Sequence, residues 1–185
     1  MMAEPIHITL PLTEEKARSL KAGDSVLISG VMYTGRDAAH KRMVETLDRG
    51  GKLPTNLIDQ VIYYVGPTPA KPGQPIGSAG PTTSGRMDAY APRIIEQGLR
   101  GMIGKGYRSQ EVIEAMKKHG AVYFVATGGA AALVAKSIKS YEVVAYEDLG
   151  PEAHAKIIVE DFPAIVAIDS EGHNFYEIGQ QQYQR

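Results

Sequence analysis

Residues 80–88, which read Gly-Pro-Thr-Thr-Ser-Gly-Arg-Met-Asp, bring several reactive side chains into a short segment. The hydroxyls of Thr82, Thr83 and Ser84 lie between two glycines and directly before Arg86. Hydroxyls, one guanidinium and the free N–H groups of a helix start are what a small carboxylate or phosphate requires. A structural interpretation is equally open, in which Thr83 or Ser84 caps the helix and the acid that follows complements its dipole.

Arg36 and Lys105 are two further cations in unusual positions. Arg36 lies in the first turn of a predicted helix, where a cation is unfavourable unless an anion binds beside the free N–H groups, and His40 follows on the same helix face. Lys105 has a glycine on either side and apolar residues before it, so its side chain can reach into a cleft. The alternatives are a surface arginine, a core histidine and a solvated loop lysine.

Gly128 and Gly129 lie between a predicted strand and a predicted helix. Such a turn can hold a phosphate at the helix N-terminus, but the pair does not form the G-x-G-x-x-G pattern of dinucleotide-binding proteins. A tight turn in which glycine permits close packing is the structural alternative.

Composition excludes several classes of protein. The 185 residues carry 20 basic and 21 acidic side chains, so the balance gives no reason to expect a nucleic-acid or anionic-membrane partner. The chain has no Cys, which excludes disulfides, a thiol nucleophile and an iron–sulfur cluster held by its own thiolates. Its five His show no metal-ligand spacing, so no metal bound by this chain alone is expected.

Hydropathy predicts a cytoplasmic protein. No stretch approaches the ~20 apolar residues of a membrane span. The first residues lack the basic and apolar regions of a signal peptide.

Periodicity predicts a single α/β domain over residues 1–185, with a central sheet and flanking helices. Strands are expected at 6–10, 25–33, 60–65, 121–126, 142–146, 157–159 and 164–168, and helices at 36–48, 87–99, 109–119 and 130–138. Residues 66–85 show no periodicity and contain five Pro and five Gly. We expect this segment to be an ordered functional loop, because structureless loops of this length inside compact domains are usually functional or disordered.

The chain resembles the β subunit, or C-terminal half, of class I iron–sulfur-dependent fumarate hydratases, a group that also contains L(+)-tartrate dehydratase. The resemblance covers about residues 5–180, and its motifs are residues 33–40, 80–88, 102–106, 126–131 and 147–150. It implies a swivelling β/β/α domain that closes on a separate α subunit. That subunit carries the cysteines of a 4Fe–4S cluster, whose unliganded iron acts as Lewis acid on the substrate, in an αβ or higher oligomer.

Site residues follow from the resemblance position by position. It implies that Arg36, Arg86 and Lys105 bind the carboxylates of a small dicarboxylate substrate and that Thr82 is the base. His40, Thr83 and Ser84 are further candidates. The implied activity is the interconversion of (S)-malate and fumarate plus water. The alternatives are a tartrate dehydratase β subunit and a non-catalytic anion-binding or assembly domain of the same fold.

Overall fold

The computed structural model describes residues 4–126 and 131–177. The strands are β1 (Ile6–Thr9), β2 (Ser25–Thr34), β3 (Val61–Tyr63), β4 (Gly101–Gly104), β5 (Val122–Val125), β6 (Ile138–Ala145) and β7 (His154–Ile168). The α-helices are α1 (Glu14–Ser19), α2 (Asp37–Asp48), α3 (Ala91–Glu96), α4 (Gln110–His119) and α5 (Ala131–Ser137), with 3₁₀ helices at Ser84–Met87 and Glu147–Glu152. Within these ranges, no helix has the length and apolar character needed to cross a membrane.

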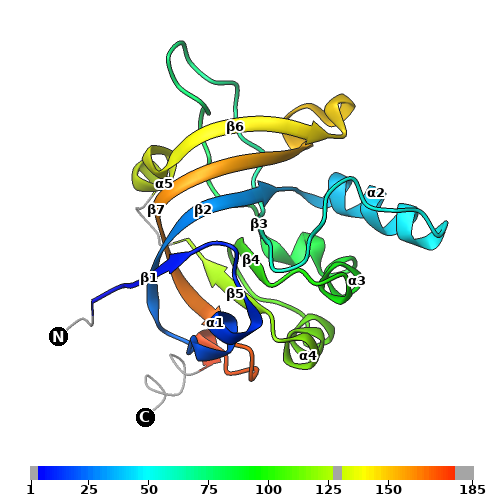
Figure 1. Ribbon diagram of the computed structural model, residues 1–185, viewed down its shortest axis with the longest axis vertical. Coiled ribbons are helices and arrows are strands. Elements are labelled where there is room, and N and C mark those ends of the chain that lie inside the picture. Colours follow the sequence, from blue (N-terminus) through cyan, green and yellow to red (C-terminus); the bar gives the residue numbers. More distant parts are fainter. Residues whose placement is uncertain (1–3, 127–130, 178–185) are drawn as a thin grey trace.

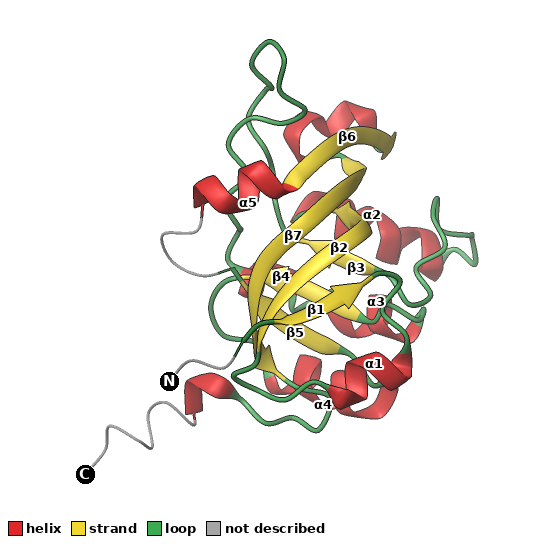
Figure 2. Ribbon diagram, turned by 60° about the vertical axis from the view of Figure 1, so that its left-hand side comes forward, coloured by secondary structure: helices red, strands yellow, loops and turns green. Residues whose placement is uncertain are grey.

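Five strands close into a barrel (Figures 1 and 2). β2, β3, β4 and β5 run parallel to one another, and the long β7 pairs antiparallel with both β5 and β2. β1 adds in parallel to the first half of β2, and β6 adds antiparallel to the first half of β7. Closure satisfies backbone groups that an open sheet would leave along its edges.

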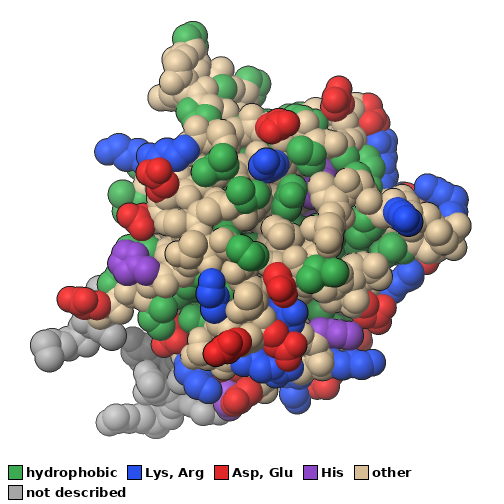
Figure 3. Space-filling model, viewed as in Figure 1, with side chains coloured by type: hydrophobic (Ala, Val, Ile, Leu, Met, Phe, Trp, Pro, Cys, Tyr) green, Lys and Arg blue, Asp and Glu red, His purple; other side chains and the backbone are tan. Residues whose placement is uncertain are grey.

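The barrel divides the core in two because side chains alternate along each strand. Tyr63 and Phe124 point to the cluster that also contains Ile28 and Phe162, whereas their neighbours Tyr64 and Tyr123 point to the cluster beneath the helices. Helices α2, α3 and α4 lie together on that side of the barrel (Figure 1). Charged side chains of both signs are interspersed over α1 and α4 on the face that Figure 3 shows.

The prediction of an α/β domain with a sheet and flanking helices is confirmed, but several details were wrong. The sheet closes into a barrel, a feature that the prediction of a central sheet did not include. The strands expected at 157–159 and 164–168 are one strand, β7, in which Asp161 has a positive φ of 53°. The helix expected at 87–99 is a 3₁₀ helix followed by the short α3, because Pro92 lies at the start of α3 and cannot lie in a helix interior.

Strand β4 was not predicted. It has only four residues and begins and ends with glycine, so its sequence carries little strand signal. The structure explains both glycines by close packing: a Cβ on Gly101 would lie 2.9 Å from the Val61 side chain, and one on Gly104 would lie 2.0 Å from Ser84 Oγ.

Residues 66–81 form an arm that extends away from the barrel beside β6 (Figure 1). Thr68 and Ser78 join its two sides, because Thr68 N donates to Ser78 O and Ser78 N donates to Thr68 Oγ1 at 2.6 Å. At its base, the Tyr63 hydroxyl donates to Ala79 O. The loop expected at 66–85 therefore returns to the barrel at the point where the hydroxyl segment begins.

Candidate active site

The predicted site residues lie where parallel strands end. Arg36 follows β2, Thr82 pairs with the chain just after β3, and Lys105 directly follows β4. In parallel sheets the carboxyl ends of the strands meet at one edge, where the ligands of α/β proteins usually bind. The topology therefore brings together residues that are far apart in the sequence.

Thr82 is held by both of its backbone polar groups. Its N–H donates to Tyr64 O at 2.7 Å, and its carbonyl accepts from Lys105 N at 3.3 Å. Ser84 N donates to Lys105 O at 2.8 Å, so residues 82–84 pair with Lys105 as a short parallel bridge. The half-buried Thr82 hydroxyl and the exposed Lys105 ammonium thus extend from adjacent, hydrogen-bonded segments.

Ser84 has a structural environment. Its side chain is buried over Gly104, and its hydroxyl lies 2.7 Å from the Tyr123 hydroxyl. The Tyr123 hydroxyl also donates to Gly106 O at 2.9 Å. Ser84 therefore packs over Gly104 and is linked to the carbonyl of Gly106 through the Tyr123 hydroxyl. The proposed capping role is wrong, because neither Thr83 nor Ser84 makes a side-chain cap of the 3₁₀ helix, and Thr83 is exposed.

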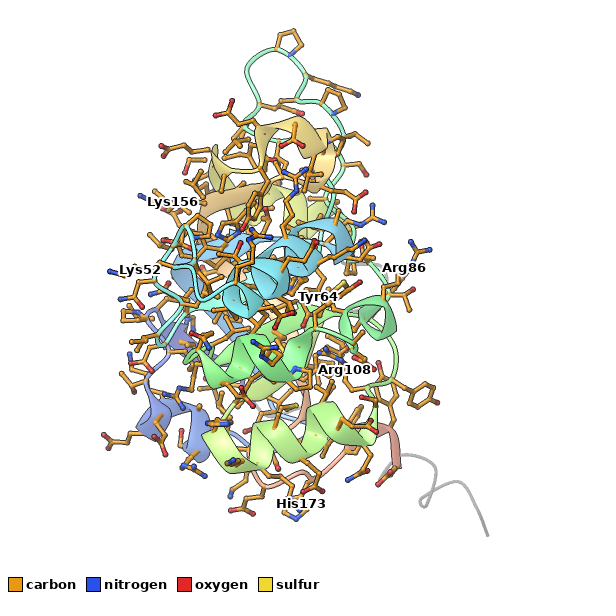
Figure 4. The ribbon with its side chains drawn as sticks, turned by 90° about the vertical axis from the view of Figure 1, so that its right-hand side faces the viewer. Lys52, Tyr64, Arg86, Arg108, Lys156 and His173 are labelled. Carbon is orange, nitrogen blue, oxygen red and sulfur yellow. The ribbon has the colours of Figure 1, made fainter. Side chains whose placement is uncertain are left out.

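Arg86 is exposed on the 3₁₀ helix Ser84–Met87 and projects from the rim of the molecule in Figure 4. No carboxylate within residues 4–126 and 131–177 forms an ion pair with Arg86 or Lys105, whereas other basic side chains on the same face of the sheet have such partners. Both cations are therefore accessible to an external anion.

Arg108 is a component of this region that sequence analysis missed. Its side chain is fully buried, its Nε donates to Asp88 Oδ1 at 2.8 Å, and a terminal nitrogen donates to the Tyr64 hydroxyl at 3.2 Å. The guanidinium lies over the rings of Tyr64 and Tyr123, 5.2 and 4.8 Å from their centroids. Figure 4 shows Tyr64 and Arg108 inside the molecule.

Asp88 connects Arg108 to helix α4, because its second carboxylate oxygen accepts from Ser109 N at 2.7 Å. The acid expected to complement a helix dipole next to Arg86 instead joins the hydroxyl segment to the start of α4. Burial raises the pKa of the Tyr64 and Tyr123 hydroxyls, so both remain protonated. The one sequence signal for Arg108 was its position directly before the N-cap Ser109.

Arg36 is the N-cap of α2, so it lies one position before the first turn in which we expected it. Its side chain makes no cap hydrogen bond, and its Nε lies 3.8 Å from both Asp37 Oδ1 and Glu152 Oε1. All three atoms are buried without a hydrogen-bond partner in the described structure. The guanidinium is thus flanked by acids on one side but not hydrogen-bonded to them.

His40 is a buried neutral histidine. Its Nδ1 donates to Arg36 O at 2.8 Å, which leaves Nε2 as a buried acceptor with no partner among the described residues. Its ring meets the Tyr64 ring edge-on, with centroids 5.4 Å apart. Burial lowers the pKa of His40 to about 4. His40 therefore connects the start of α2 to the Tyr64–Arg108 cluster and carries no charge at neutral pH.

The described residues do not fit an iron–sulfur cluster. They contain no group of three His, Cys, Asp or Glu side chains placed to hold a metal, and the sequence has no cysteine. Gly128 and Gly129, the candidate phosphate turn, lie outside the described residues.

Comparisons with known proteins identify the family. A family model described as "Fumarase C-terminus" matches residues 2–179. The aerobic class I fumarate hydratase of Salmonella typhimurium is 47% identical over 176 residues, which are 93% of this chain and 30% of that protein. Fumarate hydratase 2 of Leishmania major is 42% identical over 83% of this chain and 28% of its own length.

A shorter relative has nearly the same extent as this chain. The putative L(+)-tartrate dehydratase subunit beta of Methanocaldococcus jannaschii is 39% identical over 172 residues, which are 90% of this chain and 88% of the relative. By contrast, the chain spans about 30% of the length of the fumarate hydratases that it matches. The chain belongs to the fumarase C-terminus family.

Proposed function

We propose that this chain is the β subunit of a hydro-lyase that interconverts (S)-malate and fumarate plus water. The observation that carries the proposal is the grouping of Arg36, Thr82 and Lys105 at the carboxyl ends of the parallel strands. Arg86, which has no ion-pair partner among the described residues, lies at the rim. A dicarboxylate needs several cations and a proton acceptor, and these residue types supply them.

Each residue has a distinct role in this proposal. Loss of water from malate removes a proton from the carbon next to a carboxylate, while hydroxide leaves the neighbouring carbon. Arg36, Arg86 and Lys105 hold the two carboxylates and stabilise the charge that grows on one of them as the proton leaves. Thr82 accepts that proton. A threonine hydroxyl is hard to deprotonate, and the nearby Lys105 ammonium favours its charged form.

The 4Fe–4S cluster of such an enzyme belongs, in this proposal, to a partner α subunit. The support comes from this chain's own composition, which offers no thiolate ligand. We further propose that residues 1–185 act as one swivelling β/β/α domain that closes on that subunit in an αβ or higher oligomer. A cytoplasmic location completes the proposal, and cell fractionation tests it.

L(+)-tartrate dehydratase is the second candidate. It is favoured by the M. jannaschii relative, which carries that name and of which this chain covers 88%. The two reactions use four-carbon dicarboxylates that differ by one hydroxyl, so the cations of this site serve either one. A non-catalytic anion-binding or assembly domain is the third.

The decisive experiment combines the chain with its α subunit under anaerobic conditions. Turnover of malate, fumarate and tartrate is measured for the complex and for each subunit alone. We expect turnover by the complex only, with malate and fumarate preferred, and no cluster absorption from this chain incubated alone with iron and sulfide. Preference for tartrate selects the second candidate. Turnover by this chain alone contradicts the two-subunit proposal.

Arg86 provides the test of the carboxylate clamp. Lysine keeps the charge but loses the planar pair of donors that matches a carboxylate. The loss of charge-assisted hydrogen bonds worth roughly 1.5–3 kcal/mol lowers kcat/KM about 10- to 150-fold. Wild-type kinetics in a folded Arg86→Lys complex would show that Arg86 does not touch substrate.

A further inference from the structure

The guanidinium of Arg36 has two different sides. On one side its Nε lies 3.8 Å from an oxygen of Asp37 and 3.8 Å from an oxygen of Glu152. These distances are too long for direct hydrogen bonds, so the contacts are electrostatic. On the other side the arginine crosses Gly66, the third residue after β3.

Gly66 leaves room for the arginine. A Cβ at residue 66 would lie 2.8 Å from Arg36 Cδ and 3.0 Å from Arg36 Nη1. The backbone of Gly66 does not have a positive φ, so its conformation is open to any residue. The absence of a side chain at this position is therefore required by the path of Arg36 and not by the backbone.

Glu152 reaches Arg36 because of the pairing between β2 and β7. Thr34 is the partner of Ala155, and His154 Nδ1 lies 2.9 Å from Thr34 O. The chain just before β7 therefore runs opposite the chain just after β2, which places Glu152 across from Arg36. The side chain of Arg36 is 24% exposed and that of Glu152 is 33% exposed, so their interaction is only partly screened.

We propose that Glu152 and Gly66 are positioning residues for Arg36. Glu152 attracts the Nε side of the guanidinium and Gly66 opens its path, so the arginine is held where the chain leaves β2 and β3. The inference rests on the proposed function, in which Arg36 binds a substrate carboxylate. It adds two residues that touch neither the substrate nor the reacting atoms.

Two effects of Glu152 on KM oppose each other. The direction in which KM changes in the Glu152→Gln variant therefore shows which effect is larger. Glu152→Gln removes a negative charge near a dianionic substrate, and this alone would lower KM. It also removes the group that orients Arg36, which raises KM. If positioning dominates, KM for malate rises about tenfold while kcat stays within about twofold, which corresponds to a coupling of about 1.4 kcal/mol. A fall in KM would overturn the role of Glu152.

Gly66→Ala approaches the same arginine from the opposite side. The new methyl group must displace Arg36, so KM should again rise by about tenfold with little change in kcat. Glu152→Gln changes the segment before β7, whereas Gly66→Ala changes the segment after β3. A folding defect in one variant therefore leaves the other as a test. Thermal unfolding of each complex is recorded beside the kinetics. Asp37 is a less suitable residue to substitute in this test, because it also complements the dipole at the start of α2.

A double-mutant cycle with Arg36→Ala separates positioning from a general structural effect. In the Arg36→Ala complex there is no guanidinium to orient, so Gly66→Ala should change KM by less than about twofold, and Glu152→Gln should no longer raise KM, because only the loss of its negative charge remains. Glu147→Gln is the matched control, since Glu147 is an exposed acid at the start of the same 3₁₀ helix. It should leave KM unchanged in both backgrounds.

The cycle also distinguishes this inference from the proposed function. If Arg36→Ala impairs the complex but the effects of Glu152→Gln or Gly66→Ala simply add to it, Arg36 still binds substrate and the positioning inference is wrong. If Arg36→Ala itself leaves KM and kcat unchanged, the assignment of Arg36 to the site fails, and the positioning inference fails with it.

Discussion

Helices α2 and α4 begin in opposite ways. At the start of α4, Ser109 accepts from Val112 N, Glu111 lies in the first turn, and Gly120 ends the helix in the left-handed conformation. At the start of α2, Arg36 occupies the N-cap without a cap hydrogen bond, and buried polar atoms of Arg36, Asp37 and His40 lack partners among the described residues.

The difference follows the position of each helix start relative to the candidate site. The arginine before α4, Arg108, is buried and satisfied by Asp88 and Tyr64, so it serves the architecture. The arginine before α2 lies 3.8 Å from two acids, and its Nε has no hydrogen-bond partner among residues 4–126 and 131–177. Local rules of helix design are commonly broken where a protein binds its ligand. The comparison therefore separates structural from functional arginines.

The largest effect on stability is expected at the structural arginine. Arg108→Met leaves the partly buried Asp88 carboxylate without its ion-pair partner and should lower the free energy of unfolding by about 3–5 kcal/mol. The exposed pair between Arg93 and Asp48 is the control, and Arg93→Met should cost about 0–1 kcal/mol. Urea unfolding of the isolated chain measures both. Equal costs would show that the Arg108 cluster is not a structural anchor.

The next largest effect is the pH dependence of stability that His40 causes. Its pKa is about 4 in the folded protein, below its ordinary value of 6.5, because burial disfavours the charged ring. Its contribution to stability is thus complete above pH 6.5 and is lost as the pH falls through 4, by on the order of 3 kcal/mol. We expect wild type to lose more stability than His40→Asn between pH 7 and 4. Parallel curves for the two proteins would place His40 in a solvated environment.

Ser109 tests the capped side of the comparison. Ser109→Ala removes the hydroxyl that accepts from Val112 N and should lower the free energy of unfolding by about 1 kcal/mol. Thr83→Ala, by contrast, removes a hydroxyl that caps nothing and should be close to neutral. Chemical denaturation of both variants checks this, and a larger cost for Thr83→Ala would reverse the assignment.

A substitution of Arg36 tests the uncapped start of α2, and its expected effect on stability is the smallest of the four. Arg36→Ser places a good N-cap residue at the start of α2 and should raise the free energy of unfolding of the chain by about 0.5–1 kcal/mol. The same change should weaken substrate binding by the complex. A destabilised Arg36→Ser chain would mean that the arginine supports the fold.

The sequence predicted most reliably what depends on neighbouring residues. The helix expected at 109–119 was predicted almost to the residue, because the caps Ser109 and Gly120 lie directly beside its ends. Closure of the barrel was not, because it depends on β7 pairing with β2 across more than a hundred residues. β7 was divided into two predicted strands at the point where Asp161 has a positive φ and the pairing with β2 shifts register between Val159 and Phe162.

The site shows the same division. The hydroxyl segment and Lys105 were recognised from their residue types, and their roles remain predictions. The buried Arg108, the Tyr64 ring beneath it and the distant Glu152 were missed, because their importance arises only from tertiary contacts. A buried arginine has the same sequence signal as an exposed one. Packing alone distinguishes the two.

Thr82→Ala tests the central claim, that the edge formed by the ends of β2, β3 and β4 carries the chemistry. The measurement is exchange of solvent deuterium into malate by the complex with the α subunit, recorded together with turnover and thermal unfolding. We expect exchange and kcat both to fall by about 10²–10⁴, the range for loss of a general base, while the unfolding temperature is unchanged. Exchange and turnover near wild-type rates would contradict it and assign the proton transfer to the partner subunit.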